Sequence, residues 1–372
     1  MLRRIGLTNF KCYVSAQIKL SALTVFSGRN AVGKSTVLQA LRLMRQVALR
    51  QGDDAIVVID GPLVRFGSVD GLVNSRVPRG QNVCVSVEVS GDTDAEFGRM
   101  VLERLDDDIG GGMNKMRLSQ EEPDSFWDSL AGKDFVYLSA DRISPGDVFR
   151  YPESDLGYKC NPMGNRGEYA PWYLGTNYQE RLPLSEFNHP ASAGRETLGQ
   201  QVSLWMGNLG HEVSVEPRMY DDIRSAGFRF ALWEVDSFSK WYSPDNVGFG
   251  LTHSLPIFVT LLSRSKGSTV LIENPESHLH PKAQVEMGRF IAKAASLGIQ
   301  VLVETHSDHV LNGIRLSVKE KTLVPEEVAL NFMTTADGVV KVLNPNILPS
   351  GAVDVWPHGF FDEYENVSLE LM

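Results

Sequence analysis

One short stretch constrains the fold of this chain more than any other. It reads Gly28-Arg29-Asn30-Ala31-Val32-Gly33-Lys34-Ser35 and fits the pattern G-x-x-x-x-G-K-S. An apolar run from Leu23 to Phe26 precedes it, and a helical pattern follows from Thr36 to about Val47. Strand, glycine loop and helix in this order are the context of a phosphate-binding loop. We therefore predict nucleotide binding rather than a glycine turn that carries a solvated lysine.

The expected division of labour in this loop follows from its chemistry. Backbone N–H groups of the loop can hold phosphate oxygens, and the helix N-terminus adds its positive dipole end. Lys34 can reach the β- and γ-phosphates, and the Ser35 hydroxyl can hold Mg²⁺. The predicted nucleotide-binding residues of the loop are Gly28, Asn30, Ala31, Val32, Gly33, Lys34, Ser35 and Thr36.

Composition narrows the classes of protein that the chain can represent. Its 372 residues suffice for one large domain or two ordinary ones, and 42% hydrophobic with 22% charged residues is normal for a globular protein. The three cysteines lie far apart and form no C-x-x-C motif, which disfavours a disulfide framework or a structural zinc site. This cysteine usage fits a reducing cytoplasm, so we expect a cytoplasmic protein.

Neither a membrane nor a nucleic acid is favoured by the overall chain properties. The N-terminus lacks a signal-type apolar core, and the longest apolar run, Leu255 to Leu262, is too short to span a bilayer and contains Pro256. The net charge is −10, so any DNA contact needs a local basic patch or a partner protein.

The pattern of apolar residues predicts an α/β fold with three parts. Residues 1–142 should form a mostly antiparallel first lobe with the phosphate-binding loop, and 245–372 a second lobe with a parallel sheet. Residues 143–244 between them should form an irregular insertion, with a helix near 194–210 and strands at 213–215 and 228–235. Two further strands are expected within 323–345, around a turn at Asp337-Gly338. No sustained heptad pattern exists, so a long coiled coil is not expected.

A second set of candidates follows two apolar strands in the last third of the chain. The run Thr269 to Ile272 ends in Glu273-Asn274-Pro275-Glu276, and the run Ile299 to Val303 is followed by Glu304-Thr305-His306. A carboxylate at the end of such a strand is where an ATPase of this kind supports Mg²⁺ or activates water. His306 falls at a strand C-terminus, where open α/β sheets place their ligands. About 240 residues separate Ser35 from Glu273, which requires a large insertion in the sheet.

The order of these segments resembles the ABC-type ATPases, and among them the RecF/SMC/OLD-like branch of bacterial AAA-family proteins. A glycine pair in Asn246-Val247-Gly248-Phe249-Gly250-Leu251-Thr252-His253 is similar to the signature loop of that branch. Asn9-Phe10-Lys11 resembles its opening, and residues 273–281 resemble its E-x-P-E-x-H-L-H-P segment, here E-N-P-E-x-H-L-H-P. The segment 137–142 and a tail at 356–363, W-P-x-G-F-F-D-E, resemble a subgroup with a short C-terminal extension.

The resemblance implies ATP and Mg²⁺ as ligands and a homodimer whose heads pack face to face through the ATP sites. Lys34 and Ser35 would bind ATP in one subunit, with Glu273 supporting Mg²⁺ and His306 sensing the γ-phosphate. The signature-like residues Gly248, Phe249, Gly250 and Thr252 would contact that phosphate from the other subunit. The expected catalytic residues are Glu273, Glu276 and His306, and the expected Mg²⁺ ligands are Ser35 and Glu273.

Two positions depart from the pattern of the branch. The usual carboxylate pair is Asp-Glu, but here Glu273 is followed by Asn274, which cannot act as a general base. Either Glu276 replaces the missing base, or hydrolysis is slow and the protein is a nucleotide-gated clamp. Glu276 could instead have only a structural role, as a cap of the next turn. The signature is also loose, because Gly248 stands where serine is usual.

Other candidates have both a functional and a purely structural explanation. His278 and His280 resemble a metal pair, but no third ligand accompanies them, and a dimer interface is the better explanation. Arg142 could reach phosphate or pair with a carboxylate. The segment Trp356 to Phe361 could pack or dock a partner, and Lys11 could be structural or face DNA.

The sequence therefore predicts an ABC-type ATPase that couples ATP binding and slow hydrolysis to DNA sensing or maintenance, in antiphage defence. The alternative is an ATP-locked scaffold that regulates a separately encoded effector, a nuclease or a toxin. Asn274 favours the scaffold. Only 66 residues follow His306, too few for a nuclease domain of the OLD type.

Overall fold

The computed structural model of the chain describes residues 1–49, 56–76, 84–92, 97–105, 115–120, 132, 134–146, 148–152, 161–210, 212–234, 237–357, 359–360 and 371. The chain folds into two compact units. Unit 1 comprises Met1–Lys133, Ala329–Asn346 and Val355–Met372, and unit 2 comprises Asp134–Val328 and Ile347–Asp354. Among the described residues, no helix has the length and apolar character needed to cross a membrane.

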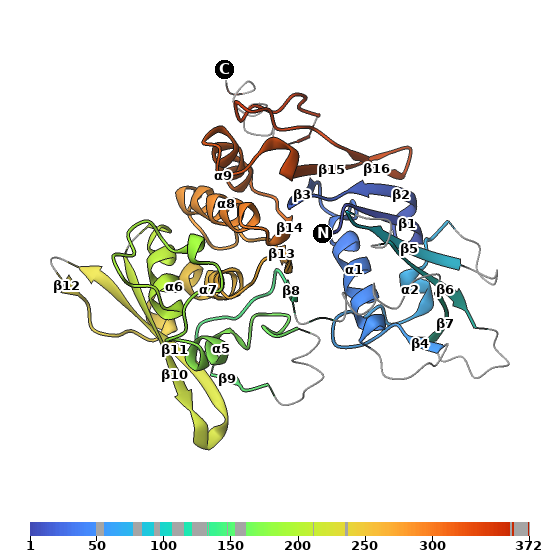
Figure 1. The fold of residues 1–372 in the computed structure, drawn as a ribbon. Helices are drawn as coiled ribbons and strands as arrows, with labels where there is room; N and C mark the ends of the chain where they lie inside the picture. The colour runs from blue at the N-terminus through green and yellow to red at the C-terminus, as the bar shows by residue number, and fades with distance from the viewer. Residues whose placement is uncertain are drawn as a thin grey trace. The chain divides into compact units, whose positions relative to one another are not determined.

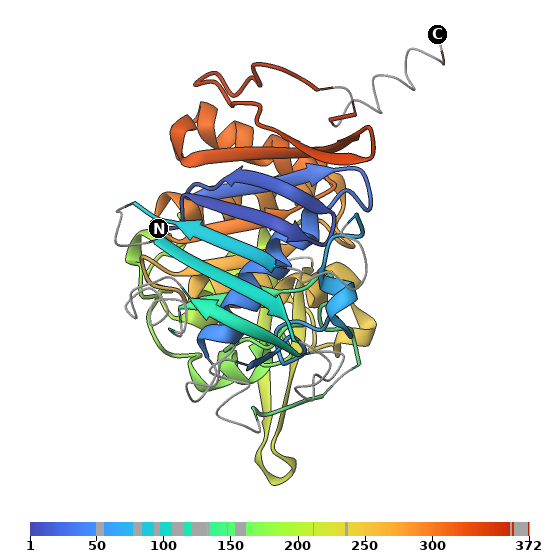
Figure 2. The same cartoon turned by 90° about the vertical axis from the view of Figure 1, so that its right-hand side faces the viewer.

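Six strands of unit 1 form an antiparallel sheet with the order β2-β1-β5-β6-β7-β4 (Figure 2). Alternate residues of each strand point to the same side of the sheet, and the residues on one side are mostly apolar, so that face of the sheet is apolar. Val85 and Val87 of β5, for example, pair with Leu102 and Met100 of β6, and all four are buried. The strands are β1 Arg4–Phe10, β2 Tyr13–Lys19, β4 Ile56–Val58, β5 Cys84–Ser90, β6 Phe97–Arg104 and β7 Lys115–Gln120.

The predicted strand, glycine loop and helix are confirmed in unit 1. Strand β3 spans Leu23–Gly28 and helix α1 spans Lys34–Ala48, with a short helix α2 at Val69–Leu72. The predicted apolar side of α1 is buried, because its apolar residues recur every three or four positions. The two strands predicted within 323–345 are confirmed as well. Strands β15 (Val328–Ala336) and β16 (Val339–Leu343) pair antiparallel around Asp337, and β15 lies beside β3.

Unit 2 contains the parallel strands that the sequence predicted, in the order β14-β13-β8. These strands are β8 Phe135–Leu138, β13 Thr269–Glu273 and β14 Gln300–Glu304. Strands β8 and β14 are buried along their whole length, as expected for a parallel sheet covered on both faces. Because the strands are parallel, Glu273 and Glu304 lie side by side at the same carboxyl edge.

Three helices of unit 2 accompany this sheet: α7 Phe249–Leu262, α8 Pro281–Ser296 and α9 Asp308–Lys319. Helices α8 and α9 pack against each other over much of their length (Figure 1). Two glycines permit this close approach. A Cβ on Gly288 would lie 2.2 Å from the carbonyl oxygen of Val310, and one on Gly313 would lie 2.1 Å from that of Val285.

The rest of unit 2 contains the predicted helix near 194–210 and the predicted strands near 213–215 and 228–235, and it is more regular within 143–190 than the composition suggested. An aromatic cluster holds it to the helices: Phe187 stacks on Phe290 of α8 at 5.2 Å between ring centroids, and the tilted ring of Trp205 lies 5.1 Å from Phe290. A hairpin of β10 and β11 extends from it (Figure 2). The elements are β9 Phe149–Arg150, α5 Ala170–Thr176, η3 Ser185–Phe187, α6 Leu198–Gly207, β10 Val213–Tyr220, η4 Asp221–Ile223, β11 Ser225–Glu234, β12 Ser237–Phe238, η5 Pro244–Asn246 and η6 Pro325–Glu327.

The predicted fold class is confirmed: the chain is mixed α/β, with both antiparallel and parallel sheets. No long coiled coil is present in the part of the chain that the structure describes. The bounds of the two compact units differ from those of the predicted lobes. The division into lobes at 142 and 244 stays a prediction.

Candidate nucleotide-binding site

The phosphate-binding loop of unit 1 runs from the end of β3 to the start of α1. Gly33 is the N-cap of α1 and has φ 98°, and Ala31 has φ 63°, so the backbone turns sharply within the loop. Lys34 is 4% exposed, and its Nζ donates to the carbonyl oxygens of Gly28 at 2.9 Å and Arg29 at 2.8 Å. The lysine head group is therefore held over the loop itself.

The loop packs against the start of β2, which the sequence analysis did not foresee. The Tyr13 hydroxyl donates to the carbonyl oxygen of Gly33 at 3.1 Å. A Cβ on Gly33 would lie 2.5 Å from Cys12 Sγ, so only glycine fits here, as its positive φ also requires. Burial raises the pKa of the Cys12 thiol, which keeps it neutral beside the loop.

The first turn of α1 has the chemistry that an anion requires. No side chain caps this helix, and none of the residues in its first turn is acidic. Its N–H groups and the dipole of the helix therefore favour a negative charge. Ser35 is half-buried at this end, and the Thr36 N–H bonds to the Gly33 carbonyl at 3.2 Å. Asn30 is exposed and Val32 is buried.

In unit 2, Glu273 ends β13 with a fixed carboxylate. Oε1 accepts from the Tyr137 hydroxyl of β8 at 3.0 Å, and Oε2 accepts from the Ala140 N–H at 3.3 Å. One donor lies near the end of the neighbouring strand β8 and the other lies directly after it, because parallel strands end at one edge of the sheet. Each carboxylate oxygen keeps a second lone pair, so the group retains the capacity to accept from a hydrated cation.

Arg142 is fully buried at this edge and binds backbone carbonyls rather than a carboxylate. Its guanidinium donates to Glu273 O at 2.5 Å, to Asn274 O at 2.8 Å, to Ser139 O at 2.9 Å and to His253 O at 3.0 Å. Burial lowers its pKa to about 10, and the charges of Glu276 and Glu273 oppose that shift. Arg142 is therefore charged at neutral pH and joins three segments of the candidate site.

Glu276 links the two loops that follow β13 and β14. Its Oε2 accepts from the Thr305 hydroxyl at 2.8 Å, and its Oε1 accepts from the backbone N–H of His306 at 2.8 Å. Thr305 is fully buried, whereas the His306 side chain is exposed. The carboxylate thus fixes the backbone beneath His306 and does not cap the turn that follows it.

The signature-like residues lie at the N-terminus of α7. Gly248 is the N-cap, without a side-chain hydrogen bond, and a Cβ there would meet open space. Gly250 packs on the carbonyl oxygen of His278, which a Cβ would approach to 2.5 Å. Thr252 is fully buried, so it faces the interior of the unit and is not poised on the surface.

An aromatic group covers this helix start. The ring centroids of Phe249 and His278 lie 4.2 Å apart, and those of His253 and His278 lie 5.1 Å apart. Phe249 and His278 are exposed, whereas His253 is buried. Burial lowers the pKa of His253 to about 4, and the Arg142 charge adds to that shift, so this ring is neutral at physiological pH.

The other candidates occupy ordinary structural positions. His280 is the N-cap of α8, and within the described ranges no three His, Cys, Asp or Glu residues are placed to hold a metal ion. Phe360 is buried and its ring lies 5.1 Å from that of Trp356, which accords with packing of the tail. His358 and residues 361–363 of the tail motif lie outside the described residues.

Sequence-predicted residues thus form two sets, one in each unit. Glu273, Glu276 and His306 come together at one sheet edge of unit 2, and the loop residues 28–36 come together in unit 1. Their assigned roles stay predictions. The sequence analysis missed the supporting contacts of Tyr13, Tyr137 and Thr305 because hydrogen bonds between distant segments leave no local pattern.

Three family models match parts of the chain. A model described as an AAA ATPase domain matches residues 1–70, which include the phosphate-binding loop. One described as an AAA domain, putative AbiEii toxin, type IV TA system, matches residues 188–312, which include the carboxylate and histidine segments. A third, a protein of unknown function (DUF3696), matches residues 323–371.

Individual proteins that resemble this chain in sequence or in fold are RecF proteins and Smc heads. DNA replication and repair protein RecF of Pseudarthrobacter chlorophenolicus and of Renibacterium salmoninarum are each 32% identical over 91 residues. The match covers 24% of this chain and about a fifth of either relative, at 21% and 22%. The fold of the Smc head from Pyrococcus furiosus, solved with the C-terminal domain of ScpA, matches with a TM-score of 0.54 at 13% identity, over 100% of this chain and 99% of that chain. Together these matches support an ABC-type, RecF/SMC-like ATPase.

A second Smc head agrees with this placement. It was solved bound to the C-winged helix domain of ScpA and matches at a TM-score of 0.50 and 14% identity, over 93% of this chain and 98% of that chain. Both identities lie far below the range in which residue roles transfer, so these two structures support the fold of the ATPase alone. The chain spans only about a fifth of the RecF relatives, so their activity is not carried over either.

Proposed function

We propose that this ATPase binds ATP and Mg²⁺, forms a homodimer through its ATP sites and hydrolyses ATP slowly, and that this cycle serves DNA sensing or maintenance in antiphage defence. The observation that carries the proposal is that the chain holds both a complete phosphate-binding loop, in unit 1, and a carboxylate and histidine edge, in unit 2. The loop ends in the buried Lys34, and the edge holds Glu273, Glu276 and His306 in fixed hydrogen bonds.

The phosphate-binding half is assigned by its chemistry. The uncapped first turn of α1 and the Lys34 ammonium are the anion-binding groups, and the Ser35 hydroxyl with the Glu273 carboxylate are the oxygen donors that would hold Mg²⁺. When bound, Mg²⁺ would neutralise charge on the phosphate oxygens. The carbonyl contacts of Lys34 support this role, since they hold the ammonium against the backbone of the loop.

Glu276 is our candidate for the general base in place of Asn274. The Asn274 amide cannot accept a proton, and its backbone carbonyl accepts from Arg142. Glu276 accepts one hydrogen bond at each oxygen, which leaves lone pairs for a water and fixes the carboxylate in one orientation. His306, exposed and anchored through its backbone to the same carboxylate, is assigned to the γ-phosphate.

The homodimer is assigned from the N-terminus of α7. This end is uncapped and has no acidic residue in its first turn, so it favours an anion just as α1 does. Phe249 and His278 lie exposed beside it. We assign Gly248, Phe249, Gly250 and Thr252 to the nucleotide of the second copy, with Thr252 acting from the interior as a support.

A scaffold that regulates a separately encoded effector is the second candidate function. Asn274 favours it, because a missing base slows hydrolysis and prolongs an ATP-locked state. The match to a family described as a putative AbiEii toxin of a type IV system supports a place in defence. The RecF relatives are named as DNA replication and repair proteins, which supports a function on DNA instead.

Steady-state ATP turnover with and without linear duplex DNA separates the two functions, with Lys34→Ala as the blank. We expect turnover above the blank that rises several-fold with DNA. Turnover equal to the blank in both conditions would reject hydrolysis and direct DNA sensing, and would support the ATP-locked scaffold.

Glu276→Gln tests the base assignment. We expect turnover to fall about 100-fold, since general bases contribute about 10²–10⁴-fold, while ATP affinity stays within about threefold. ATP should then trap the dimer, which light scattering after size exclusion detects. Thr305→Val is the matched control, because it removes one contact of Glu276 and keeps the carboxylate. An equal loss in both variants would assign Glu276 a positioning role.

A further inference from the structure

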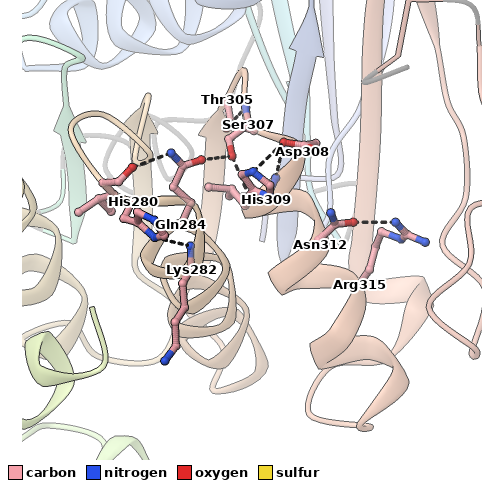
Figure 3. A network of polar contacts seen from close by, with 11 residues as sticks. His280, Lys282, Gln284, Thr305, Ser307, Asp308, His309, Asn312 and Arg315 are labelled. Carbon is pink, nitrogen blue, oxygen red and sulfur yellow. Dashed lines mark hydrogen bonds and ion pairs between the residues drawn. The ribbon is translucent and has the colours of Figure 1, made fainter. Parts of the chain in front are cut away.

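A closed ring of hydrogen bonds joins the segment after β13 to the loop after β14. Gln284, in the first turn of α8, closes it. Its Nε2 donates to the carbonyl oxygen of Leu279 at 2.8 Å, and its Oε1 accepts from the Ser307 hydroxyl at 2.5 Å (Figure 3). The Ser307 N–H donates to Thr305 Oγ1 at 3.0 Å, and Thr305 donates to Glu276. The Leu279 N–H returns to the Glu276 carbonyl at 3.1 Å.

The partners of Gln284 fix the orientation of its amide. The Leu279 carbonyl can only accept, so the NH₂ group must face it. The Ser307 hydroxyl accepts from the Val310 N–H at 3.0 Å, as the cap of α9, and uses its proton for Gln284 Oε1. A flipped amide would set two oxygens against each other at Leu279. Both hydrogen bonds of Gln284 therefore require a side chain that donates at one end and accepts at the other.

Because the ring is largely buried, its hydrogen bonds stabilise the loop that carries His306. Thr305 is 0% and Ser307 is 6% exposed, so a broken hydrogen bond there is not replaced by bulk water. The His306 backbone N–H lies within the ring through Glu276, whereas its imidazole is outside and exposed. Gln284 is only half-buried, so replacing it does not open the core.

We infer that Gln284 is a positioning residue that couples residues 276–280 to the loop of His306, so that the two move as one element. Residues 276–280 carry His278, which lies against the start of α7. The meaning of this coupling for catalysis rests on the proposed function: contact with a second copy at α7 and His278 would set the position of His306 through Gln284. The coupling itself requires no nucleotide.

Hydrogen exchange of the protein without nucleotide tests the coupling directly. The amides of Leu279, His306, Ser307 and Val310 donate within the ring or to Ser307. In Gln284→Met, which keeps the length of the side chain and loses both hydrogen bonds, we expect exchange about tenfold faster in peptides covering 276–280 and 304–310. Lys282→Met is the matched control: it lies in the same helix turn, is exposed, and its side chain points away from the ring in Figure 3.

Two results would overturn the inference: exchange in 304–310 that matches the wild type, or a rise in only one of the two peptides. If Gln284→Met does not fold, Gln284→Glu replaces it. The glutamate keeps an acceptor for Ser307 and loses the donor to Leu279, so the same two peptides should exchange faster.

Repeating the exchange experiment with ATP distinguishes a failure of this inference from a failure of the proposed function. With ATP, the wild type should gain protection in both peptides, whereas Gln284→Met should gain less protection than the wild type in 304–310 and turn over about tenfold more slowly at unchanged ATP affinity. A wild type that binds no ATP would reject the proposed function, and the exchange result without nucleotide would still decide the coupling.

Discussion

Lys34→Ala is expected to abolish ATP binding, with a loss of affinity of about 100-fold or more. The reason is that Lys34 supplies the cation of the phosphate-binding loop. Its ammonium is almost fully buried and lies against the carbonyls of Gly28 and Arg29, whereas the Arg29 side chain is exposed. Titration with a fluorescent ATP analogue measures the effect.

The matched control is Lys282→Ala, because Lys282 is exposed in the first turn of α8. It should bind ATP as the wild type does. Lys34→Ala should also remain monomeric when ATP is added, since the proposed dimer forms through the bound nucleotide. Wild-type affinity in Lys34→Ala would remove the phosphate-binding loop from the proposed mechanism.

Local patterns in the sequence predicted the elements that carry the site. The apolar run before Gly28 and the periodic apolar residues after Thr36 predicted β3 and α1, because both signals arise within about fifteen residues. The turn at Asp337-Gly338 predicted the β15–β16 hairpin for the same reason. The carboxyl ends of β13 and β14 were also predicted correctly, since buried parallel strands read as short apolar runs.

Contacts between distant segments were not predictable from the residues alone. Arg142 was left between a phosphate and a carboxylate, and the hydrogen bonds of its guanidinium go to backbone carbonyls that lie up to 132 positions away. Glu276 carried a role as a cap of the next turn, but it reaches Thr305 and His306, about 30 positions on. Backbone carbonyls are identical at every residue, so the sequence holds no sign of which of them a side chain will meet.

The irregular composition of residues 143–190 was a weaker guide. Pro, Gly, Asn and Tyr in this stretch predicted little regular structure, and α5 forms there nevertheless, with Pro171 in its first turn. Tertiary packing outweighs propensity here: Leu174 of α5 is fully buried in unit 2.

The second large effect is expected on stability, from Arg142→Met. The buried guanidinium satisfies four carbonyl oxygens from three segments of unit 2, and the substitution leaves all four without that donor. It also removes the positive charge near Glu273 and Glu276, which oppose the burial-induced fall in the Arg142 pKa. Removing one member of a buried charged network costs about 3–5 kcal/mol, so we expect a loss of at least about 3 kcal/mol in the free energy of unfolding.

Arg264→Met is the matched control for this experiment. Arg264 is also a buried arginine of unit 2, at 6% exposed, but it makes one hydrogen bond to the Ser263 hydroxyl and a cation–π contact with Tyr173. We expect this variant to lose about 1 kcal/mol. Urea denaturation followed by far-ultraviolet circular dichroism measures both variants under the same conditions.

Arg142→Lys distinguishes geometry from charge. Lysine keeps the positive charge, but its three donors radiate from one nitrogen and cannot match four carbonyls arranged around a planar guanidinium. It should therefore recover only part of the stability lost in Arg142→Met. Equal losses in Arg142→Met and Arg264→Met would contradict a special role for Arg142. Full recovery by lysine would mean that the charge beside Glu273 and Glu276, and not the four carbonyl contacts, stabilises this edge of the sheet.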